Sequence, residues 1–180
     1  SSDLGTLNID DTSGVVNWLN INGLHNTELV SEIGKRFNLE ALLLEDILNS
    51  NHRPKYEEFD NCLFLTFKML DLNESENDLL NSEQISLILG ENWVLSFQEK
   101  EGDVFEPIRS RLRSGKGKLR VNQSDFLFYR LIDNVVDNYF LITEDNSEVI
   151  ERLDELVLQS PTTEVLQEIQ RLKRRLLYLR

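Results

Sequence analysis

The sequence predicts an α/β fold: an α/β/α layered domain with a mixed central sheet, followed by a long antiparallel helical hairpin arm. Two observations support this prediction. Before residue 124, short segments with strand-like alternation are interleaved with segments of helical periodicity, which is typical of a helix-covered sheet. From Ser124 onward, apolar residues recur mostly at spacings of three and four. We therefore divide the chain into a domain at 1–123 and a helical arm at 124–180.

The first segments predict one strand and two helices. Residues 15–23 alternate between apolar and polar types and stop at a glycine, which predicts a strand. Asn26 or Thr27 can cap a helix over residues 26–37, whose apolar side chains share one face. A second, shorter helix is expected over residues 39–49, before a proline that cannot continue it.

Three strand-like segments follow. Residues 55–71 include the largely apolar run 62–70, which predicts a strand, and the polar run 73–78 predicts a turn. Residues 83–89 and 92–98 are separated by a Gly-Glu pair, as in a hairpin. A helix is then expected over residues 104–113, where a Gly-Lys-Gly-Lys run ends it.

The arm is expected to consist of two helices. Ser124 can cap the first, which should run for ~30 residues to Ser160-Pro161, and the second should run from Thr162 to the end. Residues 144–168 are strongly acidic and residues 171–180 carry only basic charges. The acidic part could concentrate cations and the basic part could face acidic groups. A solvated hairpin with no charge-related function explains the pattern equally well.

Composition limits the classes of function. The net charge of −13 at pH 7 argues against nucleic acid as a partner, because such binding requires clustered Lys and Arg. No run approaches the ~20 apolar residues that span a bilayer. The single cysteine, Cys62, lies among apolar residues and is expected to be a buried, inert thiol.

Two pairs of acids are candidates for binding a divalent cation. Asp133 and Asp137 lie four apart in an otherwise apolar helix, where their repulsion would be relieved by Mg²⁺ or Ca²⁺. Alternatively, both point to water. Glu45 and Asp46 are adjacent and therefore differ by ~100° around a helix, so at most one of them can face a given site squarely. From their pattern alone, surface acids are the default.

Several runs in this order resemble the cytosolic domain of the CorA family of magnesium and cobalt transport proteins, from about Trp18 to Arg180. The runs are Leu44-Glu45-Asp46-Ile47-Leu48-Asn49, His52-Arg53-Pro54-Lys55, Phe97-Gln98-Glu99-Lys100-Glu101-Gly102-Asp103-Val104-Phe105, Leu131-Ile132-Asp133 and Val136-Asp137. The family's membrane spans and Gly-Met-Asn pore motif are absent from these residues. The resemblance implies a fragment that ends before the stalk and transmembrane helices.

The resemblance also implies partners, an ion and a site. It implies a homopentamer at the cytoplasmic face of the inner membrane, attached through C-terminal helices, with this fragment alone soluble and with no enzymatic activity or catalytic residue. It implies regulatory Mg²⁺, for which Co²⁺ or Ca²⁺ could substitute, at interfaces between subunits. The matching metal ligands are Asp46, Glu45 and Asp133, with Asp137 supported by its helical register with Asp133. High intracellular Mg²⁺ would hold the pentamer closed.

Two other functions fit parts of the pattern. The related zinc-transporting branch shares the fold and much of the arm, although the run at 44–49 and the position of Asp133 favour the magnesium branch. An acidic scaffold or coiled-coil protein would explain the hairpin and the charge. A stable oligomer that is insensitive to divalent cations would favour the scaffold.

Overall fold

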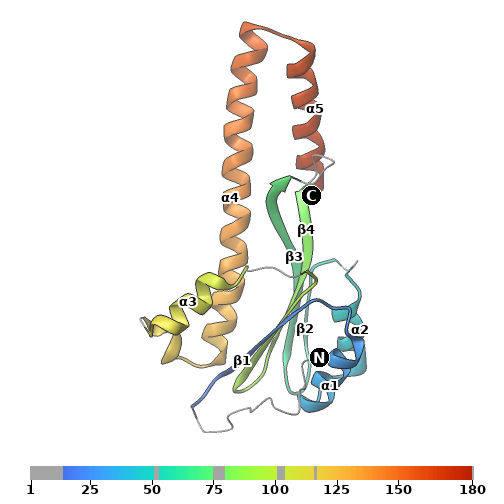
Figure 1. Ribbon diagram of the computed structural model, residues 1–180, viewed down its shortest axis with the longest axis vertical. Helices are drawn as coiled ribbons and strands as arrows, with labels where there is room; N and C mark the ends of the chain where they lie inside the picture. The colour runs from blue at the N-terminus through green and yellow to red at the C-terminus, as the bar shows by residue number, and fades with distance from the viewer. Residues whose placement is uncertain (1–13, 51–52, 75–79, 101–103, 116, 180) are drawn as a thin grey trace. The chain divides into compact units, whose positions relative to one another are not determined.

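Five strands form a single mixed sheet in the computed structural model, which describes residues 14–50, 53–74, 80–100, 104–115 and 117–179 (Figure 1). The strands are β1 (Asn17–Asn22), β2 (Lys55–Glu58), β3 (Leu63–Glu74), β4 (Leu80–Leu89) and β5 (Trp93–Gln98). Their order across the sheet is β1-β5-β4-β3-β2. β1 pairs with β5 in parallel, whereas β4 with β5 and β2 with β3 are antiparallel, so the predicted mixed sheet is confirmed.

Helices cover both faces of this sheet, as the layered prediction requires. The helices are α1 (Thr27–Arg36), α2 (Ala41–Leu48), α3 (Glu106–Ser114), α4 (Ser124–Gln159) and α5 (Thr163–Tyr178). Figure 1 shows α1 and α2 on one face, and α3 with the beginning of α4 on the other. Because strand side chains alternate between faces, each strand supplies both layers. Phe97 and Leu95 pack toward α1 and α2, while Trp18 on β1 meets Phe105 beside α3, with ring centroids 6.0 Å apart.

The chain divides into two compact units, formed by residues 1–68 with 83–134 and by residues 69–82 with 135–180. The first unit contains most of the sheet with α1, α2, α3 and the first turns of α4. The second contains the remainder of α4 with α5. The division predicted from the sequence, at residue 124, stays a prediction.

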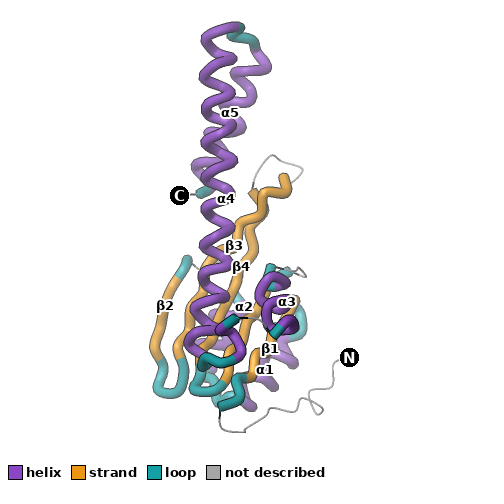
Figure 2. The backbone as a smooth tube through the Cα atoms, turned by 90° about the vertical axis from the view of Figure 1, so that its left-hand side faces the viewer, coloured by secondary structure: helices purple, strands orange, loops and turns teal. Residues whose placement is uncertain are grey.

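The helical hairpin is held within the second unit by ion pairs between its two helices. Arg152 of α4 lies 2.8 Å from Glu168 of α5, and Arg175 of α5 lies 2.6 Å from Asp145 of α4. Residues further along α5 therefore meet residues further back in α4, so the helices are antiparallel (Figure 1); Figure 2 gives a second view of these helices, turned by 90°. The Thr162 side chain accepts a hydrogen bond from the Val165 N–H, so it caps α5. Some of the arm's opposite charges thus neutralise each other across the hairpin.

Three local predictions need correction. The segment 55–71 contains two strands, because the chain turns between Glu58 and Leu63, with the Phe59 N–H donating to the Cys62 carbonyl at 2.8 Å. Strand β3 continues to Glu74, so the predicted turn at 73–78 begins inside a strand, and residues 75–78 lie outside the described residues. Ser124 begins α4 as expected, but the predicted capping role needs correction. Its hydroxyl donates to the carbonyls of Gly90 and Glu91 in the turn between β4 and β5.

Two smaller expectations concern Cys62 and membrane spans. Cys62 is buried and unpaired, and burial raises the pKa of its thiol above the ordinary value, with a further increase from the charge of Glu40. Both effects suppress the reactive thiolate. Within the described ranges, no helix is both long enough and apolar enough to cross a bilayer.

The turn between β4 and β5 has no room for a side chain at Gly90. A Cβ atom there would lie 2.1 Å from Cε2 of the Trp93 ring, which in turn packs on Phe37 with centroids 4.8 Å apart. Gly90→Ala should therefore lower the free energy of unfolding by about 2 kcal/mol.

Gly34→Ala is the matched control for urea denaturation. The atoms nearest to a Cβ at Gly34 are Cδ1, Cδ2 and Cγ of Leu44, at 2.4, 3.0 and 3.2 Å, and this side chain can shift more easily than the Trp93 ring; alanine also favours the helical backbone. Equal losses in the two variants would contradict the packing argument.

Candidate metal centre

Helix α2 presents its two adjacent acids in different directions. Glu45 is exposed, whereas Asp46 is only 4% exposed and lies on the side of α2 that packs on the sheet with Leu43 and Ile47. The helical turn of ~100° per residue accounts for this difference, as the sequence predicts. The side-chain amide of Gln84 on β4 donates to the Asp46 backbone carbonyl at 3.2 Å, which fixes α2 against the sheet at this point.

The buried Asp46 carboxylate forms an ion pair with a lysine of the same chain. Oδ2 accepts a hydrogen bond from the ammonium group of Lys55, the first residue of β2. The same ammonium group lies 3.3 Å from Glu57 and 5.9 Å from the centre of the Phe64 ring. A buried carboxylate is unfavourable unless it is paired, so Lys55 compensates the charge that α2 places on the sheet.

The ion pair also changes the titration of Lys55. The hydrogen bond to Asp46 raises the pKa of Lys55 above its usual value of 10.5, against an opposing effect of burial. A raised pKa in the folded state means that the contribution to stability is complete below the unfolded-state pKa and is lost as pH rises through the folded-state value. At neutral pH, Asp46 therefore keeps its charged partner.

Asp133 on α4 is paired in a similar way. Its Oδ2 lies 2.5 Å from the Arg130 guanidinium, one turn earlier on the same helix, and its Oδ1 accepts a hydrogen bond of 3.4 Å from the Tyr129 hydroxyl. Asp133 is half-buried. Asp137 follows one turn later, where α4 belongs to the second unit, and is exposed. The alternative interpretation, in which both acids point to water, therefore holds for Asp137 but not for Asp133.

The predicted ligands do not converge within one chain. Asp46 lies on α2 and Asp133 on α4, and within the first unit these helices cover opposite faces of the sheet (Figure 1). Across the described part of the chain, no group of three or more His, Cys, Asp or Glu residues is placed to hold a metal. Carboxylate oxygens suit Mg²⁺, but one chain offers only separate parts of a site.

The basic partners of the two carboxylates, Lys55 and Arg130, were not predicted from the sequence. Arg130 could have been found, because an Arg three positions before an Asp on a helix is a standard ion-pair spacing. Lys55 carried no local signal, since its contact with Asp46 depends on how β2 pairs beside α2.

An open groove of about 620 Å³ lies beside Glu45 in the layer of α1 and α2. Its lining includes Val30, Leu44 and Leu48 together with the Glu45 side chain. Leu42, on the same helix, is 59% exposed. An exposed acid therefore borders an apolar surface. This composition is more typical of a surface that contacts another protein than of a surface that faces only water.

The sequence pattern of the CorA-like Mg²⁺ transporter proteins matches residues 13–180. This chain belongs to the CorA family. It is 45% identical over 168 residues to the cobalt/magnesium transport protein CorA of Thermotoga maritima, an alignment that covers 93% of this chain and 48% of that protein. The chain thus spans about half the length of this CorA relative.

Solved structures show that the fold is that of the CorA family. The soluble domain of CorA from Methanocaldococcus jannaschii superposes with a TM-score of 0.67 at 18% identity, covering 84% of this chain and 59% of that chain. The ZntB cytoplasmic domain from Vibrio parahaemolyticus superposes with a TM-score of 0.64 at 16% identity, covering 94% and 69%. The predicted α/β/α domain with its helical arm is therefore confirmed.

Proposed function

We propose that this chain is the cytosolic Mg²⁺-sensing domain of a CorA-type channel for Mg²⁺ and Co²⁺, and that it acts within a homopentamer. The 45% identical relative is a cobalt/magnesium transport protein, which favours these ions over Zn²⁺. The observation that carries the proposal is the position of the acids. Glu45 and Asp46 lie on one face of the layered domain and Asp133 lies on the other.

A cyclic assembly brings together opposite faces of neighbouring subunits. In a ring, each subunit uses two different surfaces, and one surface meets the other surface of the next subunit. The α2 face of one chain and the α4 face of its neighbour would then juxtapose the exposed Glu45 with Asp133. The buried Asp46 would reach a shared cation only by exchanging Lys55 for it. The apolar groove and the exposed Leu42 beside Glu45 support an interface at this place.

The carboxylates would act as the sensor. When bound, the divalent cation supplies positive charge shared by carboxylates of two subunits. Without it, the exposed Glu45 would face acids of the neighbouring chain and repel them, which favours looser arrangements of the ring. Lys55 and Arg130 already neutralise Asp46 and Asp133 in the isolated chain, so they would compete with the cation and weaken its binding. Such competition would suit a sensor that releases its ion when the concentration falls.

Cysteine cross-linking in the full-length protein tests this arrangement. On a Cys62→Ala background, Glu45→Cys combined with Asp133→Cys should yield a ladder of covalent oligomers ending at five chains. Each single variant should remain monomeric on a denaturing gel. The control pair combines Asp60→Cys with Asp133→Cys, because Asp60 is an exposed acid in the turn between β2 and β3. An equal ladder from the control pair, or no ladder from the test pair, contradicts the ring interface.

A further inference from the structure

One short segment of this acidic protein is strongly basic. Residues 109–120 contain six of the 19 Lys and Arg residues and no acid, although the net charge of the chain is −13. The six are Arg109, Arg111, Arg113, Lys116, Lys118 and Arg120. The five described members lie on α3 and in the connection from α3 to α4, and α3 is on the opposite side of the sheet from α1 and α2.

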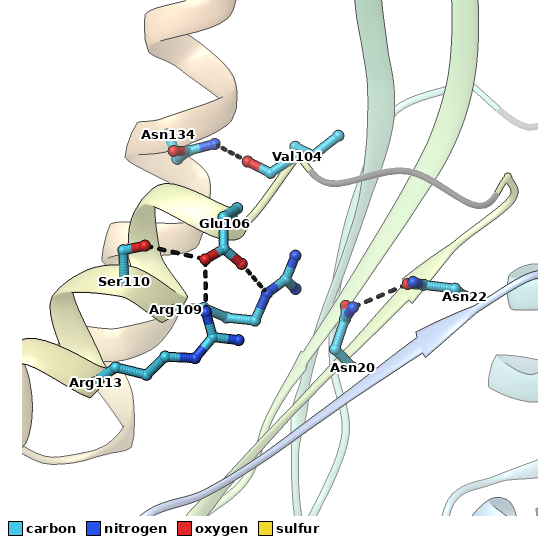
Figure 3. A network of polar contacts seen from close by, with 8 residues as sticks. All are labelled: Asn20, Asn22, Val104, Glu106, Arg109, Ser110, Arg113 and Asn134. Carbon is cyan, nitrogen blue, oxygen red and sulfur yellow. Dashed lines mark hydrogen bonds and ion pairs between the residues drawn. The ribbon is translucent and has the colours of Figure 1, made fainter.

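Some of these charges have partners inside the protein. Arg109 and Arg113 both donate to the Glu106 carboxylate, at 3.0 and 2.6 Å, as Figure 3 shows. Arg120 donates to the Leu112 carbonyl at 2.6 Å and so satisfies the C-terminal end of α3. By contrast, the charged groups of Arg111 and Lys118 have neither a hydrogen bond nor an ion pair with any described residue.

Arg111 and Lys118 both line an open groove of about 590 Å³ between the end of α3 and the first turns of α4. The α4 side of the groove supplies Phe126, Tyr129 and Arg130. The two aromatic rings are tilted by 38° with centroids 6.3 Å apart, and the Tyr129 side is exposed. The groove therefore combines cations with accessible aromatic faces.

We infer that this groove binds a nucleoside polyphosphate. Guanidinium and ammonium groups bind phosphate oxygens through charge-assisted hydrogen bonds, and an exposed aromatic face stacks on a nucleobase. The volume of the groove falls within the usual range for small-molecule sites, roughly 300–1,000 Å³. Arg111 and Lys118 hold the phosphates, while Tyr129 and Phe126 contact the base. A solvated basic surface explains the charges but not their placement around aromatic rings.

The test uses this chain without divalent cations, so its outcome is independent of the proposed Mg²⁺ sensor. ATP is titrated in excess EDTA while backbone amide NMR shifts are followed. The test variant is Arg111→Ala/Lys118→Ala, because Arg130 also pairs with Asp133. The control is Arg113→Ala, which removes a charge from the same helix but not from the groove. Sodium tripolyphosphate, which has no base, is titrated in parallel.

We expect saturable shifts confined to residues 111–119 and 126–130. The double variant should bind ATP at least about tenfold more weakly, whereas Arg113→Ala should stay within about threefold of the native chain. Tripolyphosphate should bind several-fold more weakly than ATP. The inference is overturned by shifts that do not saturate, by an equal loss of affinity in Arg113→Ala, or by equal affinity for tripolyphosphate.

Discussion

Replacing Lys55 by methionine should lower the free energy of unfolding by about 3 kcal/mol in the absence of divalent cations. Methionine keeps most of the side-chain volume but leaves the Asp46 carboxylate, which is 4% exposed, without its ammonium partner. For a chain of 180 residues, this corresponds to a fall in Tm of roughly 10 °C. Thermal unfolding followed by circular dichroism in EDTA measures it.

The double variant Asp46→Asn/Lys55→Met is the control for this prediction. It removes both charges, so most of the lost stability should return, because the cost comes from a buried carboxylate that has lost its ammonium partner and not from lost packing. Addition of MgCl₂ should stabilise Lys55→Met more than the native chain, since the cation can then take the place of the ammonium group. If the double variant is as unstable as Lys55→Met, the charge argument is wrong.

Removing the proposed ligands should make flux through the proposed channel insensitive to internal Mg²⁺. In the full-length protein, Asp46→Asn/Asp133→Asn should raise the Mg²⁺ concentration that half-inhibits flux by about a hundredfold or more, because each subunit interface loses ligands from both sides. Fluorescence of a Mg²⁺ indicator in proteoliposomes, with the internal concentration set beforehand, gives this value.

The matched control for this flux experiment is Asp60→Asn. It removes one charge at an exposed position in the turn between β2 and β3, which is not among the proposed ligands, so the inhibitory concentration should change little. A native inhibitory concentration in the double variant would mean that these two carboxylates do not sense the ion.

Most of the helices and strands are predictable from the sequence because their signals are local. Asn26 caps α1 through a hydrogen bond from the Leu29 N–H, and Gly115 ends α3 in the left-handed region, at φ 66°. The missed turn between β2 and β3 also had a local signal, the Asp60-Asn61 pair, which typically marks turns. This pair was not taken into account when residues 55–71 were predicted to be one strand-like segment.

The candidate site was predicted less completely than the fold. Helical geometry alone explains why Glu45 and Asp46 point in different directions. The partner of Asp46, however, comes from a strand nine residues away, and a sequence does not show which side chain a buried carboxylate meets after packing. The assignment of Mg²⁺ ligands came from the family resemblance and stays a prediction.

A titration of this chain with MgCl₂, followed by backbone amide NMR at constant ionic strength, tests the central claim most directly. In the native chain we expect weak, saturable shifts at α2 and around Asp133, with a dissociation constant in the millimolar range. Lys55→Met should strengthen the binding at α2 by about tenfold, since the competing cation is gone, and Asp46→Asn should abolish it. Identical shifts in all three proteins, spread over the acidic residues of α4 and α5, would contradict a Mg²⁺ site at Asp46.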